Sequence, residues 1–107
     1  YYNAGCRKGQ ILHARLRLNC SGLNEHLFQK KNIVLSSLCI CGQVESSKHY
    51  LLECHNYRLI RAQTISTLPI YNVQTLVSGS ELISDEENEY IFKVVQRFIL
   101  ETGRFGP

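Results

Sequence analysis

The sequence has no apolar run long enough to cross a membrane and no charged-then-apolar leader. A spanning helix needs about eighteen or more consecutive apolar residues, and a secretory signal needs a basic start followed by an apolar stretch. The chain of 107 residues also opens on Tyr1 rather than Met. These features predict a piece of a longer, soluble protein of the nucleus or cytoplasm, with no membrane partner.

The sequence also lacks the familiar signatures of an active site. It contains no P-loop, no GxGxxG, no Ser-His-Asp arrangement and no carboxylate pair in apolar surroundings. Internal repeats and low-complexity segments are absent too. The acidic run at residues 85–89 is explained by the start of a helix, where carboxylates are favourable. We therefore expect no catalytic residues and no small-molecule substrate.

Four residues in the middle of the chain form the pattern C-x-C-G-x6-H-x4-C: Cys39, Cys41, His49 and Cys54. Three thiolates and one imidazole in so short a window are the ligands of a small structural zinc site. A disulfide between Cys39 and Cys41 would be strained. Gly42 provides a residue that can take positive φ and aim backbone amides at sulfur. The bland alternative is a cluster of ordinary small buried residues.

The predicted zinc site is architectural, because four protein ligands leave no open position for water or substrate. His55 is a rival ligand to His49, but its side chain would diverge from that of Cys54 by about 100° on a helix. His13 and His26 lie far upstream, and we expect neither to bind the metal. Five cysteines are an odd number, and Cys6 and Cys20 are predicted to be free thiols in a reducing compartment.

Charge is divided unevenly along the chain. Residues 1–61 hold nine Lys/Arg and three Glu, a net charge of +6, whereas residues 62–107 hold three Lys/Arg and six Asp/Glu, a net charge of −3. A basic half that contains the metal motif favours contact with a polyanion. A solvated surface without a partner explains the same charges.

The fold class is predicted to be mostly α, a small helical domain built around the zinc knuckle. Apolar and polar residues alternate over residues 10–18, as they would in a strand. The good helix formers in this stretch nevertheless favour a helix, with Ile11, Ala14 and Leu18 on its buried stripe. A second short helix, capped by Ser21 or Asn24, follows and ends at residues 30–32. Extended chain then leads into the knuckle at residue 39.

The second half also reads as helical. Ser46 or Ser47 caps a helix that presents His49 in its first turn, which must be irregular or close to the helix start for Cys54 to reach the same metal. A helical run over residues 57–68 ends at Pro69, and residues 73–77 form a short turn of helix. From Ser84, a capping box starts the clearest helix in the chain, and Gly103 ends it.

We expect a single domain over residues 1–107. Its parts are a non-helical leading segment (1–9) that docks on a preceding domain, a basic helical part (10–38), the zinc knuckle with its following helix (39–68) and a C-terminal helical part (69–107).

Three stretches, at residues 12–28, 39–61 and 84–105, resemble the C-terminal end of reverse transcriptases encoded by non-LTR (LINE-like) retrotransposons of animals. The most specific stretch is CICGQVESSKHYLLECHNYRLIR. On this resemblance, Cys39, Cys41, His49 and Cys54 match the family's CCHC ligands, and Glu45 matches its acidic position before the histidine. Many relatives have two residues between the first two cysteines, whereas this chain has only Ile40.

The resemblance implies a non-catalytic module of an RNA-directed DNA polymerase, located after the polymerase part and gripping template RNA or target DNA. In this reading Tyr50 or Tyr57 stacks on bases, and the contacts to nucleic acid come from Arg7, Lys8, Arg15, Arg17, Lys30, Lys31, Lys48 and Arg61. The alternative is a docking domain, in which the metal stabilises a bundle that packs on the reverse transcriptase core.

Overall fold

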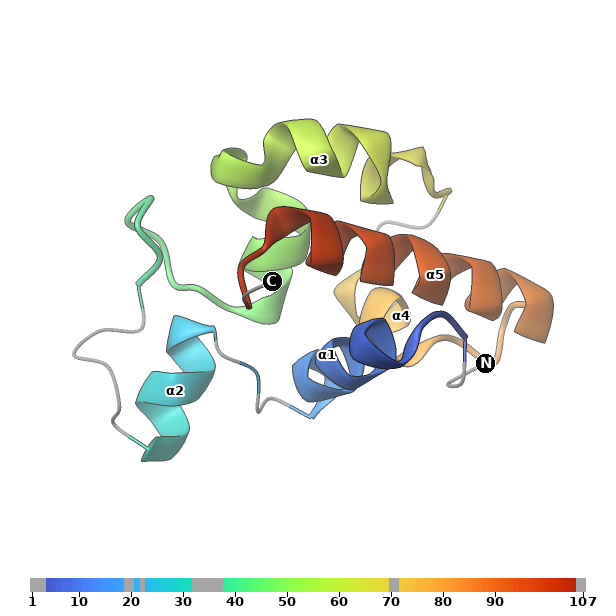
Figure 1. Ribbon diagram of the computed structural model, residues 1–107, viewed down its shortest axis with the longest axis horizontal. Coiled ribbons are helices and arrows are strands. Elements are labelled where there is room, and N and C mark those ends of the chain that lie inside the picture. The colour runs from blue at the N-terminus through green and yellow to red at the C-terminus, as the bar shows by residue number, and fades with distance from the viewer. Residues whose placement is uncertain (1–3, 19–20, 22, 32–37, 70–71, 106–107) are drawn as a thin grey trace.

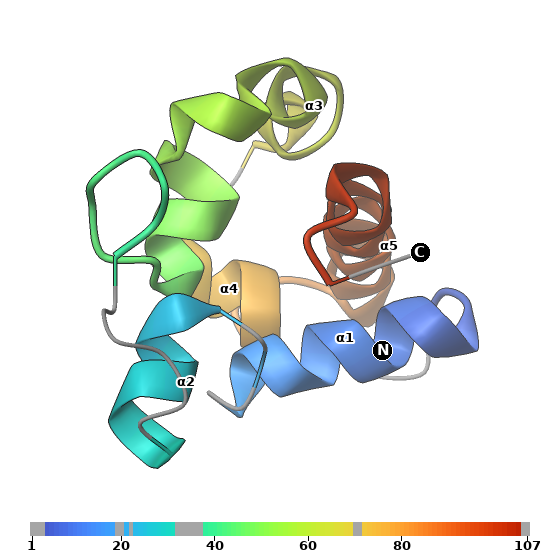
Figure 2. The same ribbon diagram turned by 60° about the vertical axis from the view of Figure 1, so that its left-hand side comes forward.

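Helix α5 (Asp85–Thr102) organises the core of this chain, whose structure is a computed structural model. Figure 1 shows α1 along one side of α5 and α3 along the other, with α4 behind, and Figure 2 gives the same arrangement nearly end-on. The structure describes residues 4–18, 21, 23–31, 38–69 and 72–105. For residues 28–31 it describes the backbone only. The other elements are α1 (Arg7–Arg17), α2 (Asn24–Lys31), the π-helix η1 (His49–Glu53), the 3-10 turns η2 (His55–Tyr57) and η3 (Ile65–Thr67), α3 (Arg58–Gln63) and α4 (Val73–Ser78).

The mostly helical fold predicted from the sequence is confirmed, and α5 follows its prediction closely. Ser84 Oγ accepts a hydrogen bond from the amide of Glu87, and Gly103 takes the left-handed conformation at the C-terminal end with φ 64°. The apolar face buries residues 91, 92, 95, 98 and 99. Three and four residue spacing places these side chains on one stripe, and the neighbouring helices cover it.

Helix α1 differs from its prediction at its start and in its buried face. It begins at Arg7, inside the predicted leading segment, because Cys6 Sγ accepts a hydrogen bond from the amide of Gly9. Leu12 and Leu16 are buried, whereas Ile11 and Leu18 are 40% and 64% exposed. The predicted stripe of Ile11, Ala14 and Leu18 was wrong, because helical spacing fits several stripes and packing against α5 and α4 selects one of them.

Three other expectations concern the leading segment, the helical run over residues 57–68 and the chain before the knuckle. The docking of the leading segment on a preceding domain stays a prediction. Within the described part of residues 1–9, the chain packs on α5, since Gln96 Nε2 donates to the carbonyl of Ala4 and its side chain lies against Gly5 and Gly9. The predicted helical run over 57–68 is interrupted at Thr64, which has φ −125° and ψ −91° and whose hydroxyl donates to the carbonyl of Ile60. The extended chain predicted before the knuckle lies mostly outside the described residues.

His13 is buried between α1, α4 and α5, where its Nε2 donates to the carbonyl of Leu76 at 2.7 Å and its ring meets Phe92 edge-on. Burial lowers the pKa of His13 to about 4, the hydrogen bond opposes this shift, and the charge of Arg17 adds to it. In the unfolded chain, the same group takes up a proton near pH 6.5. The stability that this neutral histidine contributes is therefore complete above pH 6.5 and is lost as the pH falls toward 4.

We expect the wild-type chain to lose about 2 kcal/mol of unfolding free energy between pH 7.5 and pH 5 through His13 alone. His13→Gln keeps an amide donor for Leu76 but cannot titrate. Urea denaturation of both chains at the two pH values isolates the loss that His13 causes. Protonation of the cysteine and histidine cluster lowers the unfolding free energy of both chains equally. Equal losses in the two chains would show that His13 does not carry the effect.

Among the described residues, no helix is both long enough and apolar enough to cross a membrane.

Candidate metal centre

The four side chains of the C-x-C-G-x6-H-x4-C pattern converge at one point. The three sulfur atoms and one imidazole nitrogen all lie within 4.8 Å of one another. Cys39 Sγ and Cys54 Sγ are 3.8 Å apart, and Cys41 Sγ lies 3.1 Å from His49 Nε2. Two sulfur ligands of a tetrahedral Zn²⁺ site, with bonds of about 2.3 Å, lie about 3.8 Å apart. The donor set and its spacing therefore fit a metal ion such as zinc.

A tight loop presents Cys39 and Cys41. The amide of Cys39 donates to the carbonyl of Gln43, and a single antiparallel bridge joins Leu38 to Val44. Gly42 has φ 96°, as predicted, and its amide donates to the carbonyl of Cys39. A hydrogen bond from the amide of Gln43 lowers the pKa of the Cys41 thiol. The loop thus turns a backbone dipole toward sulfur, which stabilises the thiolate that a metal requires.

A π-helical turn brings His49 and Cys54 to the same side. The amide of Cys54 donates to the carbonyl of His49 at 2.7 Å, a bond between residues five apart. Ser46 Oγ accepts from the amide of His49, so the predicted cap and the predicted irregular turn are both confirmed. On a regular helix these two side chains would point about 140° apart, whereas the wider π turn lets both ligand atoms reach the same cluster.

The centre is buried, and this affects the charge of its sulfur atoms. Cys39, His49 and Cys54 are 8%, 3% and 1% exposed, respectively. Burial raises the pKa of the Cys54 thiol to about 11, although the amide of Asn56 opposes this shift. Without a cation the Cys54 thiol is therefore neutral at pH 7. A bound divalent ion would reverse this preference, since metal coordination deprotonates a thiol.

The other histidines and Cys6 lie elsewhere. His55 is exposed in η2 and is not part of the cluster. His26 Nδ1 lies 2.7 Å from Ser21 Oγ, and His13 bonds to Leu76. Cys6 is exposed and free, and Cys20 lies outside the described residues. His49 rather than His55 is thus the histidine of the centre.

Arg61, which we expected to contact nucleic acid, is buried beneath the turn that carries His49 and Cys54. Its guanidinium donates to the carbonyls of Tyr50, Leu51 and Cys54 at 3.0, 2.8 and 2.9 Å, respectively. These carbonyls belong to η1 and to the residue that follows it, where a helix end leaves acceptors without backbone partners. Arg61 therefore positions the turn that carries His49 and Cys54, and it is only 6% exposed.

An ion pair with a buried carboxylate joins the knuckle to the segment after α5 and to the start of α2. Arg104 donates to both carboxylate oxygens of Glu45 at 2.6 and 2.9 Å, and the Glu45 side chain is 4% exposed. Glu45 Oε1 also accepts from the amide of Asn24 at the start of α2. A hydrogen bond from Arg104 to the Glu45 carboxylate raises the pKa of the guanidinium. In the sequence, only the resemblance singled out Glu45, and nothing in it pointed to Arg104.

The remaining predicted nucleic-acid residues have different surroundings. Arg7, Lys8 and Arg15 are exposed on α1. Arg17 is half-buried, donates to the carbonyl of Val77 and lies over the ring of Phe92. Lys48 is exposed and lies 3.7 Å from Glu53. The side chains of Lys30 and Lys31 are outside the described set. Tyr50 is fully buried and cannot stack on a base, because its ring packs against Tyr57, Phe98 and Phe105.

Comparison of the chain with protein-family models, with curated proteins and with solved structures gives no match.

Proposed function

We propose that this chain is a non-catalytic, zinc-stabilised module that binds nucleic acid through the basic surface beside its metal centre. The observation that carries the proposal is the separation of charge along the molecule. Arg17 and Lys48 line one cavity of about 280 Å³ next to η1, with Glu25 as its acidic member among the described residues. Arg15 and Arg104 line a neighbouring cavity. Cations from α1 and from the residue before η1 thus line these cavities, whereas the charge of Arg104 is balanced by Glu45.

Three acidic residues lie at the other end of the molecule. Asp85, Glu86 and Glu87 are exposed in the first turn of α5. Figure 1 places that end of α5 opposite the loop of residues 38–46, along a molecule whose longest dimension is 41 Å. A polyanion would be attracted to one end and repelled from the other, which supports binding in one orientation.

The sequence resemblance supports a finer proposal, that the module belongs to a retrotransposon reverse transcriptase and grips template RNA or target DNA. Zinc is the metal we propose, since thiolate and imidazole ligands in tetrahedral spacing favour it. The alternative of a docking domain on the polymerase core is supported by exposed apolar side chains at the knuckle. Ile40, between two ligand cysteines, is 99% exposed.

Salt dependence tests the proposed binding. If about five phosphates are neutralised, the logarithm of the binding constant should fall with the logarithm of salt concentration at a slope near −4.5 on duplex DNA or −3.5 on single strands. Lys8→Gln with Arg15→Gln should flatten this slope by one or two units without loss of bound zinc, because both side chains are exposed on α1. Gel shifts at several salt concentrations provide the measurement.

Lys93→Gln with Arg97→Gln is the matched control. These two residues carry the same total charge as Lys8 and Arg15. They lie on the exposed face of α5, each beside a glutamate four residues away. Their removal should leave the slope unchanged. A docking domain would instead show no shift with any nucleic acid at low salt, yet it would co-purify with the polymerase segment of its own open reading frame.

A further inference from the structure

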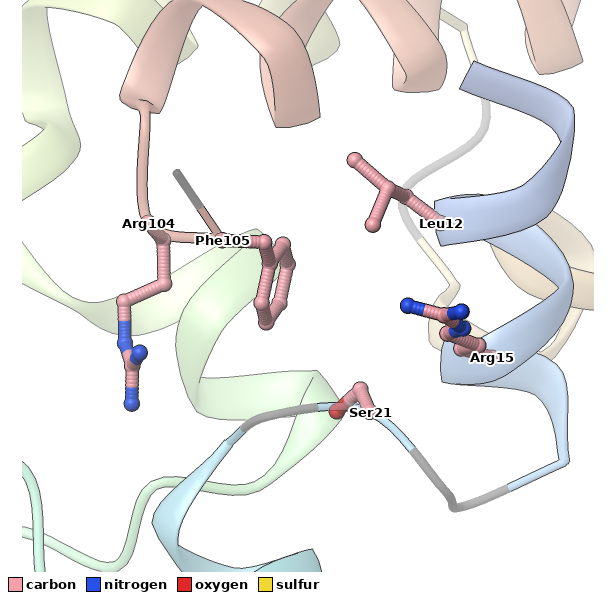
Figure 3. A pocket seen from close by; sticks show the side chains of 5 residues that line it. All are labelled: Leu12, Arg15, Ser21, Arg104 and Phe105. Carbon is pink, nitrogen blue, oxygen red and sulfur yellow. The ribbon is translucent and has the colours of Figure 1, made fainter. Parts of the chain in front are cut away.

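A cavity of about 280 Å³ lies between α1, Ser21 and the C-terminal residues Arg104 and Phe105. Figure 3 shows the Leu12 side chain and the Phe105 ring on opposite sides of this space, which the exposed Arg15 and the buried Ser21 also line. The guanidinium of Arg104 turns away toward Glu45. The cavity thus has two apolar walls and an exposed cation in its lining.

The aromatic wall is held from behind. The ring of Phe105 packs edge-on against Tyr50, with centroids 5.6 Å apart, and the Arg104 guanidinium lies 5.8 Å from the ring centroid. Tyr50 is itself fully buried, so the ring of Phe105 is supported by the core. The side of the ring that faces Leu12 remains directed into the cavity. A flat group inserted there would lie between an aromatic face and an aliphatic side chain.

The charge of the cavity selects an anionic ligand. Arg15 is exposed, and no acidic side chain is among the described residues that line the space. The nearby carboxylate, Glu45, is already bound in bidentate fashion by Arg104. A planar group that is linked to a negative charge matches both the walls and the cation. An apolar peptide side chain could pack between the two apolar walls, but it would offer no negative charge to the Arg15 guanidinium.

We propose that this cavity binds one unpaired nucleobase, stacked on Phe105 and held between it and Leu12, with the adjoining phosphate on Arg15. The inference rests on the proposed function and narrows it, because a base can enter only if it is released from a duplex. The ligand is therefore single-stranded nucleic acid. The volume is close to the lower limit of the ~300–1,000 Å³ typical of small-molecule sites, which suits one base and its sugar rather than a larger group.

The test compares single-stranded RNA or DNA with a duplex of the same sequence. Phe105→Leu keeps apolar packing on Tyr50 but removes the aromatic face. It should weaken single-strand binding by about 5- to 150-fold, the range for one lost base stack, while the salt slope and the duplex affinity stay unchanged. Phe105→Tyr should restore the single-strand affinity. Tyr90→Leu is the control, because Tyr90 is an exposed aromatic residue on α5, 59% accessible and outside the cavity.

A second measurement needs no variant. A single strand carrying 5-bromouracil, irradiated on the wild-type chain, should cross-link to Phe105 or Leu12 when the peptides are mapped by mass spectrometry. Cross-links confined to other residues would overturn the proposal, as would equal single-strand binding by wild type and Phe105→Leu. In both cases the proposed function would survive if the salt-dependent gel shift persisted. If the wild-type chain bound no nucleic acid, both proposals would fail.

Discussion

Removal of the metal with excess EDTA is expected to unfold residues 39–60 and to abolish most of the tertiary structure. Structural zinc sites in small peptides supply about 10 to 16 kcal/mol of apparent binding energy near neutral pH, as much as the entire stability of a typical domain. Here the ligands include the buried residues Cys39, His49 and Cys54, and η1 contributes Tyr50 and Leu51 to the core. Without the ion, the loop and the π turn would lose the bonds that join them to each other, although Arg61 would still donate to the turn.

Far-UV circular dichroism and native mass spectrometry check this prediction before chelation, after it and after zinc is restored. Cys54→Ser should fail to retain zinc and should resemble the chelated chain. Cys6→Ser is the matched control, because Cys6 is an exposed thiol outside the cluster. The site would be disproved if EDTA changed neither the spectrum nor the mass and released no zinc.

The second large effect is expected at the ion pair between Arg104 and Glu45. Arg104→Met should lower the unfolding free energy by about 3 kcal/mol, near the lower limit for a broken buried pair, because the Glu45 carboxylate would remain buried without its partner. The guanidinium side chain is 25% exposed, which moderates the loss. Urea denaturation of the zinc-loaded chain measures the change.

Glu45→Gln completes the test. The amide oxygen of Gln can still accept from Asn24, so this change removes charge while it keeps the link to α2. The double variant should be more stable than the sum of the two single losses predicts, since it leaves no unpaired carboxylate. Additive losses would show that the two side chains do not depend on each other. Arg97→Met, at an exposed pair, should cost less than 1 kcal/mol.

The sequence determined the parts of this protein that depend on neighbours along the chain. The spacing of three cysteines and one histidine predicted a metal centre, and the structure brings those four side chains together. Ser84, the apolar stripe of α5 and Gly103 predicted the last helix, and Gly42 predicted the turn of the knuckle. Each of these features is local, because caps, helical periodicity and ligand loops are formed by residues a few positions apart.

Tertiary structure alone decided which of several permitted surfaces became buried. Helical spacing in α1 allowed Leu18 or Leu16 to face the core, and packing on α5 chose Leu16. Arg61 is a charged residue of the kind usually found on the surface. It is buried because its guanidinium donates hydrogen bonds to three backbone carbonyls of the turn that carries His49 and Cys54. Glu45 and Arg104 are 59 residues apart and meet only after the chain folds. Partners so distant leave no periodic signal, because their contact depends on how the helices pack and not on any local pattern.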